Sequence, residues 1–141
     1  MIMSRRKVAA VVENGAVMPQ SLLIDKDINS NRLVVVFRND RLEGDDGELG
    51  RKLLVPYLEA LLRLSEKPRA LLFYNTGVRL LTEHSEAIKL LSKFEKEGCE
   101  LLACNLSLMH LGLSGSLLVG EISTQEIMLE RQIKADKILW P

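Results

Sequence analysis

The feature that most constrains the fold of this chain is an alternation of short apolar runs with longer segments of helical periodicity. Three of the runs have the nearly continuous apolar character of parallel strands covered on both faces: residues 33–37, 69–74 and 100–104. Between them, leucines recur every three or four positions over 49–62, and Ile88, Leu91 and Phe94 repeat that spacing. The alternation predicts a three-layer α/β sandwich with a mainly parallel sheet.

Capping residues and shorter apolar runs predict the remaining elements: a helix with its N-cap at Ser85 and its end at Gly98, a short helix over 106–111, a strand over 117–119, a helix begun by a capping box over 123–126, and a final strand over 137–140. Pro56 lies within the first helical segment, where its missing N–H should produce a kink.

Residues 1–31 do not follow this alternation. Two apolar runs, Val8–Val12 and Ala16–Met18, flank Asn14 and Gly15, which is typical of a β-hairpin with a two-residue turn. We therefore expect an N-terminal hairpin or arm over residues 1–31 and one α/β domain over residues 32–141. The total of 141 residues fits a single domain of ordinary size.

Composition excludes several classes of function. Lys and Arg together number 19, as do Asp and Glu, so the chain lacks the basic excess of a protein that binds nucleic acid by neutralising phosphates. No apolar run reaches the ~20 residues of a membrane span. The run that follows Arg5, Arg6 and Lys7 is too short for a secretory signal. We expect a cytoplasmic protein with no membrane span and no nucleic-acid partner.

The two cysteines, Cys99 and Cys104, lie at opposite ends of one predicted strand, about 16 Å apart at ~3.3 Å per residue. A disulfide requires Cα atoms within ~7 Å, so both residues are expected to be free thiols in a reducing compartment. With His84 and His110 they do not match the ligand spacing of a zinc site. We therefore expect neither a metal ion nor another cofactor.

Ligands of open parallel sheets bind at the carboxyl ends of the strands, which here precede residues 38–48, 75–77, 104–107 and 120–123. Cys104 stands out because it ends a strand and precedes a short helix, whose free N–H groups favour the nucleophilic thiolate. Its position leaves open the alternative of a small buried packing residue, the interpretation that we prefer for Cys99. His110 follows a turn and a half later, so we do not expect it to pair with Cys104.

The acidic segment over residues 44–50 does not match a phosphate-binding loop. It has no lysine, and Asp45, Asp46 and Glu48 would repel a phosphate. These carboxylates more simply complement the dipole of the following helix. A magnesium site that uses Asp40 with Asp45 or Asp46 is the alternative. Asn75 belongs to a turn sequence, and its place at the sheet edge would also allow it to orient a ligand.

Several separated motifs, in order, resemble the DsrE/DsrF-like family, and most closely the C-terminal domain of YedF, a sulfurtransferase-like protein of selenium metabolism: GDDGELG over 44–50, LLFYNTGVRLLTE over 71–83, ELLACNLSLMHLGL over 100–113, VGEIST over 119–124 and ADKILWP over 135–141. The resemblance covers about residues 32–141. YedF-like domains commonly have Cys-x-x-Cys where this chain has Cys104 and Ser107, and their N-terminal Cys-Pro module has no counterpart here.

The resemblance implies a parallel α/β sandwich and a sulfur-relay or sulfurtransferase-like role, with sulfane sulfur or selenium carried as a persulfide on Cys104. The supporting pocket residues are then Asn105 and Ser107, as donors to the sulfur, together with Asn75, Gly77 and Asp46. The partners would be sulfur donor and acceptor proteins, and a homo-oligomer is expected. The alternative is a non-catalytic oligomeric subunit or a small-ligand-binding module of the same fold.

Overall fold

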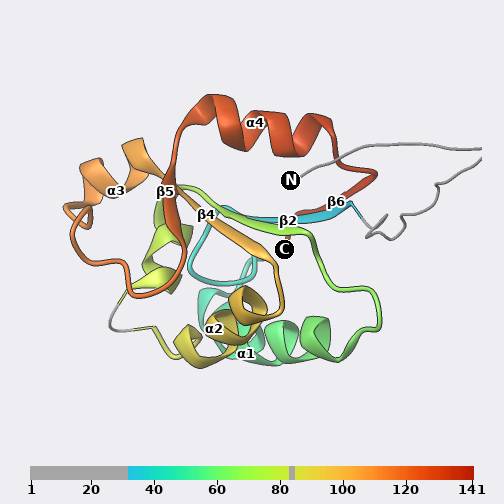
Figure 1. Ribbon diagram of the computed structural model, residues 1–141. Coiled ribbons are helices and arrows are strands. Elements are labelled where there is room, and N and C mark those ends of the chain that lie inside the picture. The colour runs from blue at the N-terminus through green and yellow to red at the C-terminus, as the bar shows by residue number, and fades with distance from the viewer. Residues whose placement is uncertain (1–31, 83–84) are drawn as a thin grey trace, which may run out of the picture. The chain divides into compact units, whose positions relative to one another are not determined.

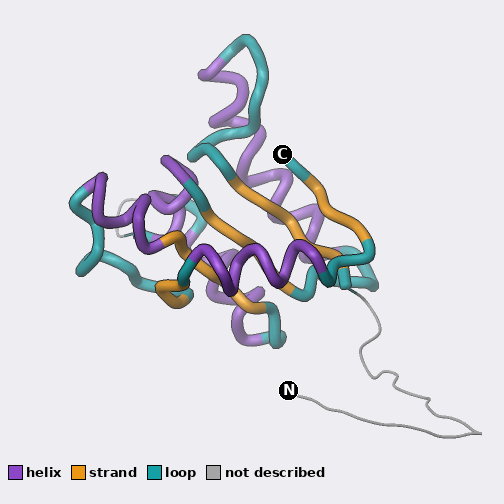
Figure 2. The backbone as a smooth tube through the Cα atoms, turned by 90° about the horizontal axis from the view of Figure 1, so that it is seen from above, coloured by secondary structure: helices purple, strands orange, loops and turns teal. Residues whose placement is uncertain are grey.

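Five strands form an all-parallel sheet within the described part of the chain, in the order β5-β4-β3-β2-β6 (Figures 1 and 2). The computed structural model describes residues 32–82 and 85–141, so the expected hairpin over residues 1–31 and His84 lie outside the described residues. The strands are β2 (Leu33–Phe37), β3 (Ala70–Phe73), β4 (Glu100–Cys104), β5 (Glu121–Ser123) and β6 (Lys137–Leu139). The predicted parallel α/β fold is confirmed.

Helices cover both faces of the sheet, with α4 on one face and α1 and α2 on the other (Figure 1). The helical elements of the described residues are α1 (Gly47–Arg63), the 3₁₀ helix η1 (Asn75–Leu81), α2 (Ile88–Lys96), α3 (Asn105–Leu111) and α4 (Gln125–Ile133). The helix α1 runs unbroken through Pro56. The three layers follow from strands that are apolar on both faces and therefore need cover on both.

Strand alternation divides the core between the two faces. The larger cluster includes Val35 and Phe37 of β2 and receives Leu58 from α1 and Phe94 from α2. The smaller cluster lies on the α4 face, where strand residues pack against a single fully buried side chain of that helix, Met128. The cover on the α4 face is therefore thin, and this is the face that holds the sulfur of Cys104.

The predicted strand over residues 117–119 is wrong, because the fourth strand to join the sheet is β5, over Glu121–Ser123. The earlier segment is instead fastened to the end of η1, where the Leu118 N–H donates to the Leu81 carbonyl. Gly120 then turns the chain with φ +82°, a conformation that favours glycine. Pairing with β4 begins only after this turn, at Glu121.

Three further differences concern helix starts. Ser85 is not the N-cap of α2, which begins at Ile88, but its hydroxyl accepts the Ala87 N–H in the turn before it. Thr124 rather than Ser123 caps α4, because Ser123 still belongs to β5 and the Thr124 hydroxyl accepts the Ile127 N–H. The turn expected at residue 75 is the start of η1.

Candidate functional site

Cys104 is the last residue of β4 and the N-cap of α3. Its sulfur accepts a hydrogen bond from the Ser107 N–H at 3.4 Å. The residue is 2% exposed and packs in the cluster beneath α4 that contains Met128. The predicted position at the carboxyl edge of the sheet is thus confirmed, and the thiol is covered rather than open to solvent.

Cys99 is also buried, at 6% exposure, but its thiol has a different set of partners. The thiol donates to the Glu100 carbonyl at 3.6 Å, which requires that the sulfur keep its proton. Burial and the negative charge of Glu100 raise the pKa of the Cys99 thiol to about 12, and they outweigh the opposite effect of a hydrogen bond with the Leu71 backbone. Cys99 therefore fits the predicted packing role, whereas Cys104 presents its sulfur to a donor that stabilises negative charge.

Two polar side chains flank Cys104 on the neighbouring strands. Ser123 pairs with Cys104 in the register of β4 and β5. Phe73 and Ala103 are the last paired residues of β3 and β4. Tyr74 and Cys104 are the next residue on each chain segment, so they lie side by side. Residues level in a parallel sheet point to the same face, so all three side chains project toward α4. We call Tyr74, Cys104 and Ser123 the polar row.

The polar row has few hydrogen-bond partners. The Tyr74 hydroxyl accepts from the Gln132 amide of α4 at 3.0 Å, while the Ser123 hydroxyl is buried and has no partner among the described residues. Burial raises the pKa of the Tyr74 phenol, and a negative charge on Cys104 acts in the same direction. Tyr74 is therefore a neutral hydroxyl that lies within electrostatic range of the sulfur.

Ser107 links the Cys104 loop to the end of β3. Its hydroxyl accepts the Asn75 N–H at 2.9 Å, so the Ser107 contact with sulfur comes from its backbone and not, as predicted, from its hydroxyl. Asn75 has φ +52°, the only positive φ of a residue other than glycine among those described. The oxygen of the Asn105 side chain accepts the Leu106 N–H at 2.8 Å, a contact within α3.

The other two predicted pocket residues have structural roles. At Gly77, a Cβ atom would lie 2.3 Å from the Phe37 carbonyl oxygen, so only glycine lets η1 pass this close to the end of β2. Asp46 is the N-cap of α1 and accepts the N–H groups of Glu48 and Leu49, as its expected role at the helix dipole requires. No hydrogen bond or ion pair in the described residues joins Asp46 to the Cys104 loop.

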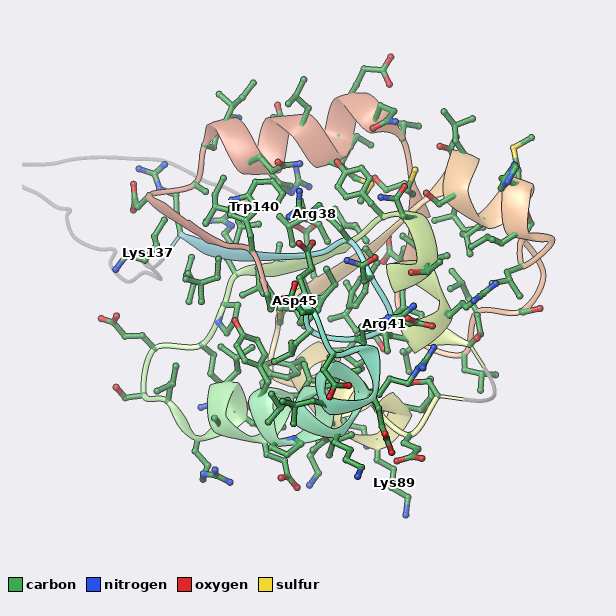
Figure 3. The ribbon with its side chains drawn as sticks, turned by 180° about the vertical axis from the view of Figure 1, so that it is seen from behind. Arg38, Arg41, Asp45, Lys89, Lys137 and Trp140 are labelled. Carbon is green, nitrogen blue, oxygen red and sulfur yellow. The ribbon has the colours of Figure 1, made fainter. Side chains whose placement is uncertain are left out.

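A polar depression of about 560 Å³ lies at the carboxyl ends of β2 and β3 and is lined by Arg38, Asn39, Arg41, Leu42, Glu43, Gly44, Asp45, Gly47 and Asn75. Arg38 stacks on Trp140 at 5.1 Å and pairs with Glu43 at 2.8 Å, near Asp45 (Figure 3). Because acidic and basic groups balance here, the depression shows no preference for an anion. No group of three or more metal-binding side chains occurs in the described ranges, so the magnesium alternative gains no support.

Sequence reasoning singled out Cys104 but neither Tyr74 nor Ser123, although Ser123 lies within the segment 120–123 that was expected at the sheet edge. The sequence did contain an indication for Tyr74, because this residue directly follows a strand and so lies at the edge of the sheet where ligands bind. Ser123 was hidden by the misplaced strand, since a residue expected to cap a helix is not expected to point into a sheet face. No helix in the described residues is long and apolar enough to cross a membrane.

Comparisons with known proteins show a likeness of fold. No family model and no curated protein matches the sequence. Among solved structures, MTH1491 of Methanobacterium thermoautotrophicum, described as a protein of unknown function, is similar over 79% of this chain and 100% of its own, with 25% identity and a TM-score of 0.60. The YchN protein of E. coli is similar over 77% of this chain and 97% of its own, with 16% identity and a TM-score of 0.53. The chain therefore shares its fold with proteins of the DsrE/DsrF-like type.

Proposed function

We propose that this protein carries sulfane sulfur, or selenium in its place, as a persulfide on Cys104. The observation that carries the proposal is the hydrogen bond from the Ser107 N–H to the Cys104 sulfur at the carboxyl edge of the sheet. The DsrE/DsrF-like fold and the sequence motifs around this residue support it. Ser107 stands where the related Cys-x-x-Cys motif has its second cysteine, so Cys104 cannot close a disulfide within this loop. A carrier needs only one cysteine, because the sulfur passes from one thiol to the next.

The transfer needs no oxidant or reductant. The Cys104 thiolate attacks the terminal sulfur of a donor persulfide, whose S–S bond breaks and whose electron pair leaves on the donor's own thiolate. The new S–S bond joins that sulfur to Cys104. An acceptor thiolate then attacks the same terminal sulfur, and Cys104 leaves as the thiolate that began the cycle. The Ser107 N–H would stabilise negative charge on Cys104 at the start and at the end.

Access to the sulfur is part of the proposal, because Cys104 is 2% exposed. The thiol lies on the face covered by α4, which contributes Met128 as its one fully buried side chain. The strand before this helix, β5, is only three residues long and lies at the edge of the sheet. Polar contacts also hold α4 to the sheet, namely a bidentate Arg131–Glu100 pair and the Gln132–Tyr74 hydrogen bond. Because few buried apolar contacts support them, we infer that displacement of α4 opens the path to Cys104.

The second candidate function is that of a non-catalytic oligomeric subunit. It is favoured by the burial of Cys104 and by exposed apolar side chains, seven of which belong to residues 106–133: Leu106, Met109, Leu118, Ile122, Ile127, Leu129 and Ile133. A subunit of this kind would use that surface for assembly and leave Cys104 unreactive. A ligand-binding module that uses the polar depression is a weaker form of the same alternative.

Intact mass spectrometry after incubation with a sulfane-sulfur donor tests the proposal. We expect the wild-type protein and Cys99→Ala to gain the mass of one sulfur atom, reversibly under a thiol reductant, and Cys104→Ser to gain none. The Cys99→Ala variant is the matched control, since it removes the other buried thiol, which lies immediately before the same strand. No gain on the wild type, or an equal gain on Cys104→Ser, would refute the carrier and leave the oligomeric subunit.

A further inference from the structure

The hydroxyl of Ser123 is unpaired in a place where burial makes this costly. Ser123 is 5% exposed, and its oxygen is fully covered with no hydrogen-bond partner among the described residues. Buried hydroxyls are almost always paired, and an alanine in this position would avoid the penalty. The unpaired hydroxyl therefore indicates a partner that the resting arrangement does not engage.

The polar group on the adjacent strand is the sulfur of Cys104. The two residues are directly paired in the register of β4 and β5, whose backbones lie about 4.8 Å apart as in any sheet, and their side chains share the α4 face. Rotation about the Ser123 Cα–Cβ bond turns the hydroxyl toward or away from the neighbouring strand, so no backbone movement is required.

A charge on the sulfur would give this hydroxyl its partner. A neutral thiol is a weak acceptor, whereas hydrogen bonds to an ionised group are roughly twice as strong as those between neutral groups. The Ser107 N–H supplies one donor, and an anion on a face lined by Val36, Leu72 and Met128 needs more than one. Ser123 is directly paired with Cys104, and its buried hydroxyl has no partner among the described residues, whereas the Tyr74 hydroxyl on the other side already binds Gln132.

We propose that Ser123 is a catalytic residue whose hydroxyl donates a hydrogen bond to the anionic sulfur of Cys104. It does so to the thiolate before sulfur transfer and to the charged outer sulfur of the persulfide afterwards, and with the Ser107 N–H it forms a two-donor pocket. The persulfide part rests on the proposed function, while the thiolate part requires only that Cys104 ionise. Ser123→Ala should therefore slow the reactions of Cys104 without weakening the fold.

Alkylation by iodoacetamide at one fixed pH measures the thiolate part, in a Cys99→Ala background where Cys104 is the only thiol. We expect Ser123→Ala to lower the rate constant about tenfold, the effect of losing one charge-assisted hydrogen bond. Ser123→Thr keeps the hydroxyl and should restore most of the rate. Thermal unfolding should show Ser123→Ala to be at least as stable as its parent, because no existing hydrogen bond is lost.

The same three proteins are then incubated with the sulfane-sulfur donor. If the parent takes up sulfur and Ser123→Ala takes it up more slowly, both the carrier and the role of Ser123 are supported. If the parent takes up none but alkylation still depends on the hydroxyl, the carrier fails and the donor role stands. Equal alkylation rates for Ser123→Ala and its parent, an unreactive Cys104 in the parent, or a slow Ser123→Thr would overturn the role of Ser123.

Discussion

At the scale of single residues, the thiols of Cys104, which ends β4, and Cys99, which immediately precedes it, differ in hydrogen-bond partners and hardly in burial. Cys99 donates its proton to a carbonyl, and Cys104 accepts an N–H. Position in the sequence predicted this difference, because a residue that ends a strand and begins a helix meets free N–H groups. It did not predict that Cys104 would be covered, since the packing of α4 on the sheet depends on residues 20 or more positions further along the chain.

The raised pKa of Cys99 has a measurable effect on stability. The folded protein holds this proton until about pH 12, whereas an unfolded thiol loses it from pH 9. The contribution of this thiol is complete below pH 9 and is lost as pH rises toward 12, at up to about 1.4 kcal/mol per pH unit. Urea denaturation at ~pH 8 and ~pH 10 should show a steeper loss for wild type than for Cys99→Ala. Parallel losses would contradict the assigned environment.

The positive φ of Asn75 predicts an order of stabilities. Left-handed backbone costs a non-glycine residue roughly 1–2 kcal/mol, least for asparagine and most for β-branched residues. We expect Asn75→Gly to equal or exceed the wild-type free energy of unfolding and Asn75→Val to fall about 1–2 kcal/mol below it. Both variants keep the N–H that Ser107 accepts, so the comparison isolates the backbone. A Val variant more stable than the Gly variant would be inconsistent with this conformation.

At the scale of elements, apolar runs and caps were sufficient to predict most of the sheet. The strands β2, β3, β4 and β6 lie where the sequence places them, because each is an apolar run with turn residues beside it. The position of β5 could not be predicted in this way. Its residues Glu121 and Ile122 are exposed at the sheet edge, whereas the more apolar Leu117 and Val119 pack in the larger core cluster without joining the sheet.

Substitution of Met128 tests whether α4 controls access to the Cys104 sulfur, because Met128 is the one fully buried side chain of this helix. Met128→Ala should cost about 2–5 kcal/mol of stability, as loss of a buried methionine does. It should also raise the alkylation rate of Cys104 severalfold more than that of Cys99, because local opening of α4 exposes only the α4 face. Leu129→Ala, on the exposed side of the same helix, is the control. Equal acceleration of both thiols would mean that the whole domain unfolds instead.

At the scale of the whole molecule, the exposed apolar side chains gather in the second half of the chain. Seven of the eleven large apolar residues exposed in the described ranges lie between Leu106 and Ile133. These belong to α3, β5, α4 and the segment between α3 and β5, which are neighbours in Figure 1. Exposed apolar patches that include a sheet edge commonly mark an interface, and the outer edge of β5 pairs with no other strand of residues 32–82 and 85–141.

A charge on this surface tests the expected homo-oligomer. Leu129 on α4 and Leu49 on α1 are exposed to almost the same degree, 55% and 52%, on different helices. We expect Leu129→Glu to shift the sedimentation coefficient toward that of a single chain and Leu49→Glu to leave it unchanged. A wild-type protein that sediments as a single chain at every concentration would contradict the expectation.

We expect Cys104 to be a reactive sulfur and Cys99 to be unreactive, although both are buried. Site-resolved alkylation of the native wild-type protein, read by peptide mapping over time, compares the two thiols within one molecule. We expect the peptide with Cys104 to be modified well before the peptide with Cys99. Modification of both peptides at one common rate, equal to the rate of global unfolding, would contradict the claim.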